Sequence, residues 1–207
     1  MGSQLYTLMR ILCLLSFALF LTKETFSQVH IGIRSGINIA TTRDLIAFPK
    51  NRLGWYSGIG AQIPFQERLF LQPELIYSSK GDKTNSQSGA STYSLRLNYI
   101  NFPILVGYKF DKKTSVLLGT ELGYLLAARL LIDNDNNLNV VKQHPPKFDV
   151  GASIGLQYKV IKSVGIEIRY NYGFNTFYSV DAVGIRYSEM KGANRVFQIG
   201  VNYIFHD

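Results

Sequence analysis

The stretch Arg195-Val-Phe-Gln-Ile-Gly-Val-Asn-Tyr-Ile-Phe205 ends two residues before the C-terminus. From Phe197 onward, large apolar residues alternate strictly with polar or small residues. The polar or small residues are Gln198, Gly200 and Asn202. A period of two places successive side chains on opposite faces of a β-strand. The stretch therefore predicts a strand with one apolar face that ends in aromatic residues.

This last strand resembles the C-terminal assembly signal of bacterial outer-membrane β-barrels. In that signal a polar residue, a glycine and two hydrophobic residues recur at the same spacing. The matching residues here are Gln198, Gly200, Tyr203 and Phe205. The resemblance implies that the strand closes a barrel and that the barrel assembly machinery is a partner. Many soluble edge strands also alternate, so the prediction depends on the other end of the chain as well.

The N-terminal residues have the pattern of a secretory signal peptide. Arg10 precedes an uncharged apolar run at 11–21, and a short polar stretch leads to Ser27. A cationic start, an apolar core of about 7–15 residues and a small residue at the exit are typical of such peptides. An uncleaved anchor is the alternative, but a spanning helix needs about 20 residues. We therefore predict a cleaved signal peptide at 1–27, export through the inner membrane, and one outer-membrane β-barrel domain at 28–207.

The composition excludes several classes of function. Cys13 is the only cysteine and lies in the signal, so the mature chain has no thiol, disulfide or thiolate metal site. Without the signal, 20 Lys and Arg stand against 13 Asp and Glu, a net charge of +7. The cations are scattered and no nucleic-acid motif is present, so we predict no nucleic-acid partner. They fit loops and rims that face the anionic headgroups of lipid and lipopolysaccharide.

Eight alternating segments can be distinguished along the mature chain. They cover residues 29–40, 54–63, 69–79, 98–110, 115–128, 148–158, 164–172 and 195–205. The connections alternate between long polar loops, such as 80–92, 132–146 and 175–194, and short turns. This alternation puts all long loops at one end, as in outer-membrane barrels. The fold class predicted is all-β, an eight-stranded antiparallel up-and-down transmembrane β-barrel.

Periodicity alone leaves open which face points inward, so a soluble lipocalin-like barrel has to be considered. An eight-stranded barrel has room only for its own side chains. Roughly five large apolar residues per strand would overfill it, whereas the glycine-rich polar face fits. Aromatic residues also gather near strand ends, which is typical of interfacial girdles. They are Tyr77, Tyr108, Tyr124, Tyr158, Tyr172, Tyr203 and Phe205. We therefore predict that the apolar face contacts lipid.

With that register, seven charged side chains project into the barrel. They are Arg34, Glu74, Lys109, Glu121, Asp149, Glu167 and Arg169. In the reverse register the basic ones would face lipid, at about 2–4 kcal/mol each at the midplane. Inside the barrel, opposite charges can pair and hydrogen-bond. The first interpretation is a structural plug of ion pairs, and the alternative is a selective pore.

Pro73 and Pro103 are unusual because they fall inside two of the predicted strands. Proline lacks the N–H that a strand uses for pairing, and a closed barrel has no free edge to accommodate the loss. We therefore expect either β-bulges there, or neighbouring placement of the two prolines so that few hydrogen bonds are lost.

The same two segments resemble the signature strands of the PorT-like outer-membrane β-barrel family. They read Leu71-Gln-Pro-Glu-Leu-Ile-Tyr-Ser-Ser-Lys-Gly81 and Tyr99-Ile-Asn-Phe-Pro-Ile-Leu-Val-Gly-Tyr108. Later stretches and the closing strand match in order, so the resemblance covers essentially the whole mature chain. Two positions depart from the family. Asn101 stands where an acidic residue is common, and Gly107 stands where a lysine is common, so an interior ion pair between them is absent here.

The resemblance implies a barrel in the outer membrane of a Gram-negative bacterium. The namesake of the family serves type IX secretion, the export of proteins across the outer membrane, but most members have no assigned role. The function predicted is therefore a non-enzymatic structural or accessory component of the cell envelope. Support of type IX secretion, with secretion components as partners, is the more specific expectation.

Chemical alternatives find little support among the residues. A lipid-modifying enzyme would need a base beside a nucleophile, and His30, His144 and His206 are poorly placed for that role. The same three residues lack the spacing of metal ligands. We predict no enzyme, no catalytic residues, no cofactor and no metal site. A lipid-modifying enzyme, a narrow pore and a ligand-binding barrel remain the alternatives.

The stretch from Asp133 to Asn137 begins like a calcium loop. However, Leu138 stands where the sharp turn of such a loop needs glycine, and His144 stands where a bidentate glutamate is expected. A solvated loop is the preferred interpretation, with weak calcium binding left open.

Overall fold

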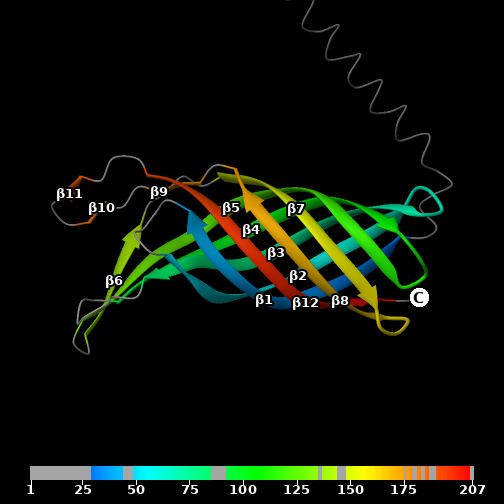
Figure 1. The fold of residues 1–207 in the computed structure, drawn as a ribbon, viewed down its shortest axis with the longest axis horizontal. Coiled ribbons are helices and arrows are strands. Elements are labelled where there is room, and N and C mark those ends of the chain that lie inside the picture. The colour runs from blue at the N-terminus through cyan, green and yellow to red at the C-terminus, as the bar shows by residue number, and fades with distance from the viewer. Residues whose placement is uncertain are drawn as a thin grey trace, which may run out of the picture.

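The computed structural model describes residues 29–43, 49–84, 92–134, 137–143, 148–174, 176–178, 181–182, 185–186 and 190–205. The predicted signal peptide and its cleavage after Ser27 lie outside these residues. Eight long strands form a closed antiparallel β-barrel, which confirms the predicted fold class (Figure 1). They are β1 (His30–Arg43), β2 (Pro49–Pro64), β3 (Leu69–Thr84), β4 (Thr92–Lys109), β5 (Thr114–Asn134), β7 (Phe148–Lys159), β8 (Val164–Gly173) and β12 (Met190–Ile204).

The last strand closes the barrel. Each long strand pairs with the next along the chain, and β12 returns to pair with β1. This closing ladder runs from Gly32 opposite Ile204 to Arg43 opposite Ala193. None of the described residues forms a helix long and apolar enough to cross a membrane.

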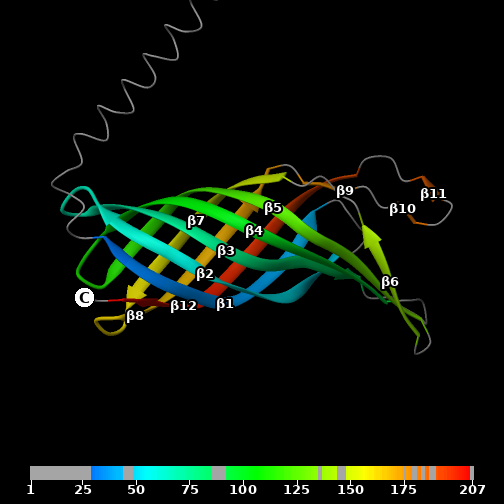
Figure 2. The ribbon, with the colours of Figure 1, turned by 180° about the vertical axis from the view of Figure 1, so that it is seen from behind.

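The connections at the two ends of the barrel differ in length, as predicted. At the end where the C-terminus lies, four-residue turns join β2 to β3, β4 to β5 and β7 to β8 (Figure 1). Each turn is closed by a backbone hydrogen bond, for example from the N–H of Val160 to the carbonyl of Val164 at 2.9 Å. The opposite end carries the longer connections. There, two short strands add to the barrel sheet, namely β6 (Asn137–Gln143) beside β5 and β9 (Thr176–Tyr178) beside β12, while β10 (Asp181–Ala182) and β11 (Ile185–Arg186) pair only with each other (Figure 2).

Several strands are longer than the predicted segments, so the predicted loop boundaries at this end were wrong. The predicted loop at 80–92 begins inside β3, which continues to Thr84, and much of the loop at 132–146 is β6. Gly81 has a φ of 129°, a conformation that side-chain-bearing residues rarely adopt. Polar residues and glycine indicated a loop at this point, but Gly81 adopts its positive φ within the strand, and pairing with β4 continues on both sides of it.

The outer surface of the barrel is apolar over its middle and aromatic near both ends. Large apolar side chains such as Ile37, Leu118 and Ile168 are exposed on it. Near the short turns, Tyr108 packs edge-on against Phe110 with ring centroids 5.2 Å apart. Further aromatic pairs lie nearer the other end, namely the edge-on pairs Tyr124–Phe148 and Tyr172–Phe174 and the tilted pair Trp55–Tyr77. An apolar band between two aromatic girdles is the surface of a barrel embedded in lipid.

The distribution of apolar residues inverts where the sheet extends beyond this band. There the inward side chains of β4 and β5 are apolar and form one buried cluster, and the outward Arg96 and Arg129 are exposed. The cluster consists of Leu95, Leu97, Tyr99, Leu125 and Ala128. The pairing between β4 and β5 shifts register between Asn98 and Tyr99, at the end of this cluster nearer the middle of the barrel. Outside the membrane water surrounds the sheet, so apolar side chains are stabilised by turning inward.

The two prolines lie on neighbouring strands, which confirms the second of the two expectations. Pro73 is opposite Ile104, the residue next to Pro103, and the register between β3 and β4 is unchanged on both sides. Pairing is interrupted only between this position and Ile76, which is opposite Asn101. The lost pairing is thus limited to this gap and to a second one beside Pro73 in the β2–β3 ladder, between Gly60 opposite Glu74 and Ile63 opposite Leu71.

Candidate functional site

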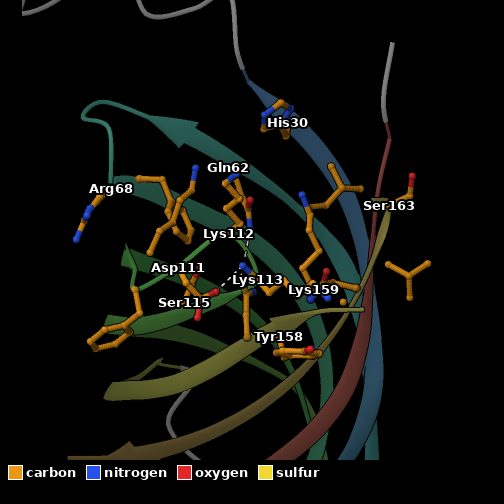
Figure 3. A pocket seen from close by; sticks show the side chains of 18 of the residues that line it. His30, Gln62, Arg68, Asp111, Lys112, Lys113, Ser115, Tyr158, Lys159 and Ser163 are labelled. Carbon is orange, nitrogen blue, oxygen red and sulfur yellow. Dashed lines mark hydrogen bonds between the residues drawn. The ribbon is translucent and has the colours of Figure 1, made fainter. Parts of the chain in front are cut away.

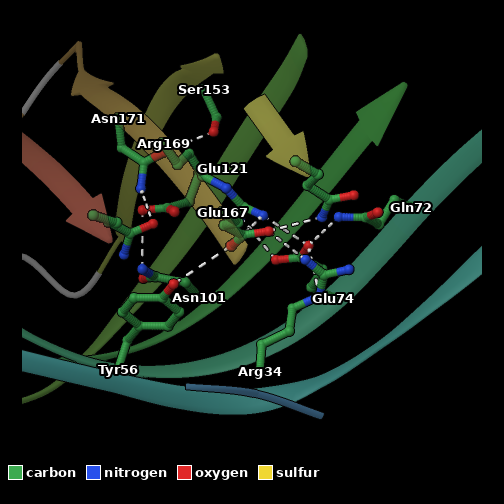
Figure 4. Close-up of polar contacts among 12 residues, drawn as sticks. Arg34, Tyr56, Gln72, Glu74, Asn101, Glu121, Ser153, Glu167, Arg169 and Asn171 are labelled. Atoms are coloured by element: carbon green, nitrogen blue, oxygen red, sulfur yellow. Dashed lines mark hydrogen bonds and ion pairs between the residues drawn. The ribbon is translucent and has the colours of Figure 1, made fainter. Parts of the chain in front are cut away.

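Two arginines and two glutamates form a closed cluster in the middle of the barrel (Figure 4). Strand β1 contributes Arg34, β3 contributes Glu74, and β8 contributes Glu167 and Arg169, all with inward side chains because of the strand period. Arg34 contacts Glu167 at 2.5 Å and Glu74 at 3.2 Å. Arg169 contacts Glu74 through two hydrogen bonds of 2.8 and 2.9 Å, and Glu167 at 3.1 Å. Each arginine thus contacts both carboxylates, and the cluster is electrically neutral.

The cluster bridges the whole lumen. In the closed strand order β3 and β8 are four positions apart, so they lie on opposite sides of the barrel. The bidentate Arg169–Glu74 pair therefore spans the barrel from wall to wall. Glu74 is 2 % exposed and Arg169 is equally buried. Removing charges from water is costly, and this geometry offsets the cost because charge-assisted hydrogen bonds occupy both oxygens of each glutamate.

Neutral polar side chains add hydrogen bonds to the carboxylates of the cluster, while the Nε of Arg169 is buried without a partner. Gln72 donates to Glu74 at 2.6 Å, and Gln157 donates to Glu167 at 2.8 Å. Gln62 of β2 donates to Gln72 at 2.9 Å and to Gln157 of β7 at 3.3 Å, which forms a second bridge across the lumen. These amides form a polar layer between the charge cluster and the end with the short turns.

The structure separates the other three predicted interior charges from this cluster. Glu121 pairs with Lys80 at 2.5 Å, and Asp149 accepts a hydrogen bond from Asn194 at 2.8 Å. Lys109 lies at the end with the short turns, where its ammonium group is 5.7 Å from the centre of the Phe70 ring. The seven predicted charges are thus distributed over several sites along the barrel axis.

Lys80 is a buried interior charge that the sequence prediction missed. It was assigned to a loop, yet it is 2 % exposed, and its ammonium group lies 5.2 Å from the centre of the Tyr99 ring. Its even-numbered position continues the inward series of Glu74, Ile76 and Ser78. That unbroken period of two was the signal that could have identified Lys80 as an inward residue.

The residues of the assembly signal lie on both faces of β12. Gln198 and Gly200 face the interior, whereas Tyr203 and Phe205 are exposed on the outside. Gln198 links neighbouring strands by donating to Asn38 and accepting from Asn171. Gly200 also leaves room for the Tyr56 side chain, since a Cβ at this position would be 2.0 Å from the Tyr56 hydroxyl oxygen. Recognition by the assembly machinery stays a prediction.

The two departures from the PorT-like pattern have structural counterparts. Asn101 donates a hydrogen bond to Glu121 at 2.9 Å, in the place of an acidic residue. The Phe70 ring covers Gly107, where a Cβ would lie 2.1 Å from the ring. Phe70 also belongs to an apolar cluster with Leu105 and Leu117. An aromatic ring and an apolar cluster therefore occupy the space that a lysine at position 107 would enter.

This complementarity predicts the effect of a single added methyl group. Gly107→Ala is expected to lower the free energy of unfolding by about 1–3 kcal/mol, because the new Cβ would overlap the Phe70 ring, whose atoms are the nearest to it. The double variant with Phe70→Leu should regain most of that loss. The measurement is reversible urea unfolding in lipid vesicles. Equal stability of Gly107→Ala and the native protein would contradict this packing.

The chemistry of the central cluster is that of structural ion pairing. Its four residues include no histidine, serine or cysteine, the residues most often used as base or nucleophile. No group of three potential metal ligands occurs among the described residues. His30 lies at the end with the short turns, while His144 and His206 are outside the described residues. In the stretch with a calcium-like pattern, Asn134 of β5 is opposite Asn137 of β6, and residues 135–136 lie outside the described residues.

Comparison with solved structures identifies similar barrels. Neisserial surface protein A is similar over 84% of this chain and 97% of its own, with a TM-score of 0.54 and 14% identity. Ail, the attachment invasion locus protein of Yersinia pestis, is similar over 86% of this chain and 99% of its own, with a TM-score of 0.50 and 14% identity. At such identities the likeness shows the fold alone. No curated protein matches the sequence significantly.

The sequence itself matches a family model over most of its length. Residues 22–179 match the model described as "Outer membrane protein beta-barrel domain". This match agrees with the closed barrel, its apolar outer band and its charged interior. The chain therefore belongs to the outer membrane protein beta-barrel domain family and is an eight-stranded outer-membrane β-barrel protein.

Proposed function

We propose that this protein is a non-enzymatic, closed barrel that acts as a structural or accessory component of the outer membrane. The observation that carries the proposal is the Arg169–Glu74 pair, which joins opposite walls of the barrel. A barrel of eight strands has room for its own side chains but little more. Partners of such a protein bind at its two ends, and the lumen serves stability.

Neutral pairing of the interior supports this proposal over a selective pore. A selective pore uses unpaired charges or polar rings that line an open path. Here the four central charges neutralise one another, and the Gln62–Gln157 bridge crosses the lumen on one side of them. On the other side, the Lys80–Glu121 pair occupies the interior between β3 and β5. A solvated ion would have to displace several buried hydrogen-bonded groups to pass.

Conductance in a planar bilayer tests the closed lumen. The purified protein is expected to show no stable single-channel steps. The charge-balanced variant Glu74→Ala/Arg169→Ala removes the pair that spans the lumen and should introduce small, brief conductance steps. The matched control Glu67→Ala/Arg68→Ala, in the exposed turn between β2 and β3, should stay silent. Stable steps from the native protein would contradict the proposal.

The more specific proposal is support of type IX protein secretion, with secretion components as partners. It is supported by the two segments that resemble PorT-like strands, which form β3 and β4 here. The test compares the protein content of medium and periplasm in a deletion strain, its parent and a complemented strain. Cargo that accumulates in the periplasm and is exported again on complementation would support the secretion role. Unchanged export would reject it and leave the structural role intact.

A further inference from the structure

The barrel end with the short turns contains an open cavity of about 510 Å³ (Figure 3). Short turns of outer-membrane barrels lie on the periplasmic side, so the cavity opens toward the periplasm. Its walls come from the turns after β2, β4 and β7, and Phe70, Gln62 and Gln157 lie among its inner lining. We refer to it as the periplasmic cup. The ring of strands separates its interior from the surrounding lipid.

The periplasmic cup has an excess of positive charge. Five cationic side chains and two carboxylates line it. The cations are Arg68, Lys109, Lys112, Lys113 and Lys159, and the carboxylates are Glu67 and Asp111. None of the five cations forms an ion pair with a carboxylate in the described part of the chain. A concave surface with one dominant sign of charge concentrates ligands of the opposite sign.

The carboxylate of Asp111 is already used by its own turn. It accepts hydrogen bonds from the backbone N–H groups of Lys113 at 2.6 Å and Thr114 at 2.7 Å. These bonds hold the pKa of Asp111 below its usual range. Asp111 therefore stabilises the turn that presents Lys112 and Lys113, and these two ammonium groups remain available to a ligand.

A buried amide also faces the periplasmic cup. Asn202 of β12 is 5 % exposed and lines the cavity. Its side chain makes no hydrogen bond within the described part of the chain, and its amide is not among the fully buried polar atoms that lack a partner, so it is accessible from the cavity. The facing residue on β8 is Gly165, whose missing side chain leaves the amide room. An amide offers both a donor and an acceptor, so Asn202 can pair with a ligand that carries both.

We propose that the periplasmic cup binds an acidic peptide segment of a periplasmic protein. The cations come from two turns and from the ends of β4 and β7, so they match several charges spread along an extended chain better than one compact phosphate. The donor and acceptor of the Asn202 amide match a peptide backbone, which offers both N–H and C=O groups, whereas a phosphodiester offers only acceptors. The cavity volume is in the range of about 300–1,000 Å³ that is usual for ligand sites. This site goes beyond the proposed structural role and does not depend on secretion.

Binding of a fluorescently labelled hexaglutamate peptide tests the proposal. The native barrel, folded in a zwitterionic detergent, should bind the peptide with an affinity that falls as salt rises. The variant Lys112→Gln/Lys113→Gln/Lys159→Gln removes three exposed charges and should weaken binding by about tenfold or more. Asn202→Ala should weaken binding severalfold and leave the salt dependence unchanged, because it removes no charge.

The matched control removes three exposed cations at the other end of the barrel, Lys83→Gln/Arg96→Gln/Arg129→Gln. It should bind the peptide like the native protein, and labelled hexaglutamine should not bind. The proposal is overturned if the native barrel does not bind hexaglutamate, or if the control loses as much affinity as the lysine variant. Displacement of bound hexaglutamate by inorganic phosphate at the same total charge would also overturn the proposal, since the cup would then be a general anion site. Heat-dependent gel mobility verifies that each variant is folded.

Discussion

Replacing Arg169 with Met is expected to lower the free energy of unfolding by about 3–5 kcal/mol, the largest loss from any single change in the barrel interior. Arg169 holds Glu74 with two hydrogen bonds and also contacts Glu167. Without it, Arg34 alone faces two buried carboxylates. One of them would have to stay charged without a full partner or take up a proton. Urea unfolding in lipid vesicles measures the loss, with Trp55, the only tryptophan, as the fluorescent probe.

A double variant separates this effect from loss of packing. Glu74→Gln/Arg169→Met leaves Arg34 paired with Glu167 at 2.5 Å, so the interior is again neutral. It should be about 1–3 kcal/mol more stable than the sum of the two single variants predicts. Arg129→Met, at an exposed position on β5, should change the stability by no more than about 0.5 kcal/mol. Equal effects of Arg129→Met and Arg169→Met would contradict a stabilising role of the cluster.

Ile168→Lys is expected to destabilise the barrel in a lipid bilayer by about 2–4 kcal/mol. Ile168 lies opposite Leu156 of β7 and Ile199 of β12, and 46 % of its surface is exposed on the outer face. It is halfway along β8, so a lysine there would place an ammonium group in the middle of the apolar band. The same vesicle-based unfolding experiment measures the effect.

The control for this prediction is Tyr203→Lys in the aromatic girdle near the short turns. A lysine at this depth reaches the headgroups, so the cost should be about 0–1 kcal/mol. Ile168→Val, which keeps the apolar character, should cost no more than about 1.5 kcal/mol. If lysine costs the same at both depths, the exposed apolar band does not contact the hydrocarbon.

Local alternation was sufficient to predict much of this fold. The period of two correctly assigned Ile37, Leu118 and Ile168 to the outside, and strong alternation in the last strand correctly predicted closure. It failed where the surroundings change from lipid to water, since the outward side is then polar. The loop predicted from Lys80 onward is such a place, because polar residues continue a strand there.

Within the interior, alternation predicted which charged residues point inward but not which of them meet. Glu74 and Arg169 are far apart in the sequence, and their contact depends on the position of β3 and β8 in the closed ring. The fit of Phe70 over Gly107 likewise depends on the stagger between β3 and β4. A sequence pattern describes one strand at a time and contains no information on such distances.

The sequence by itself therefore determined the strand order, the lipid-facing side and the inward direction of the seven predicted charges, because each of these follows from a pattern along the strands. Only the tertiary structure decided that the central charges pair across the lumen, that Lys80 pairs with Glu121, and that lysines from separate parts of the chain surround one periplasmic cup. These features depend on the closure and stagger of the barrel, which bring together residues that lie far apart along the chain.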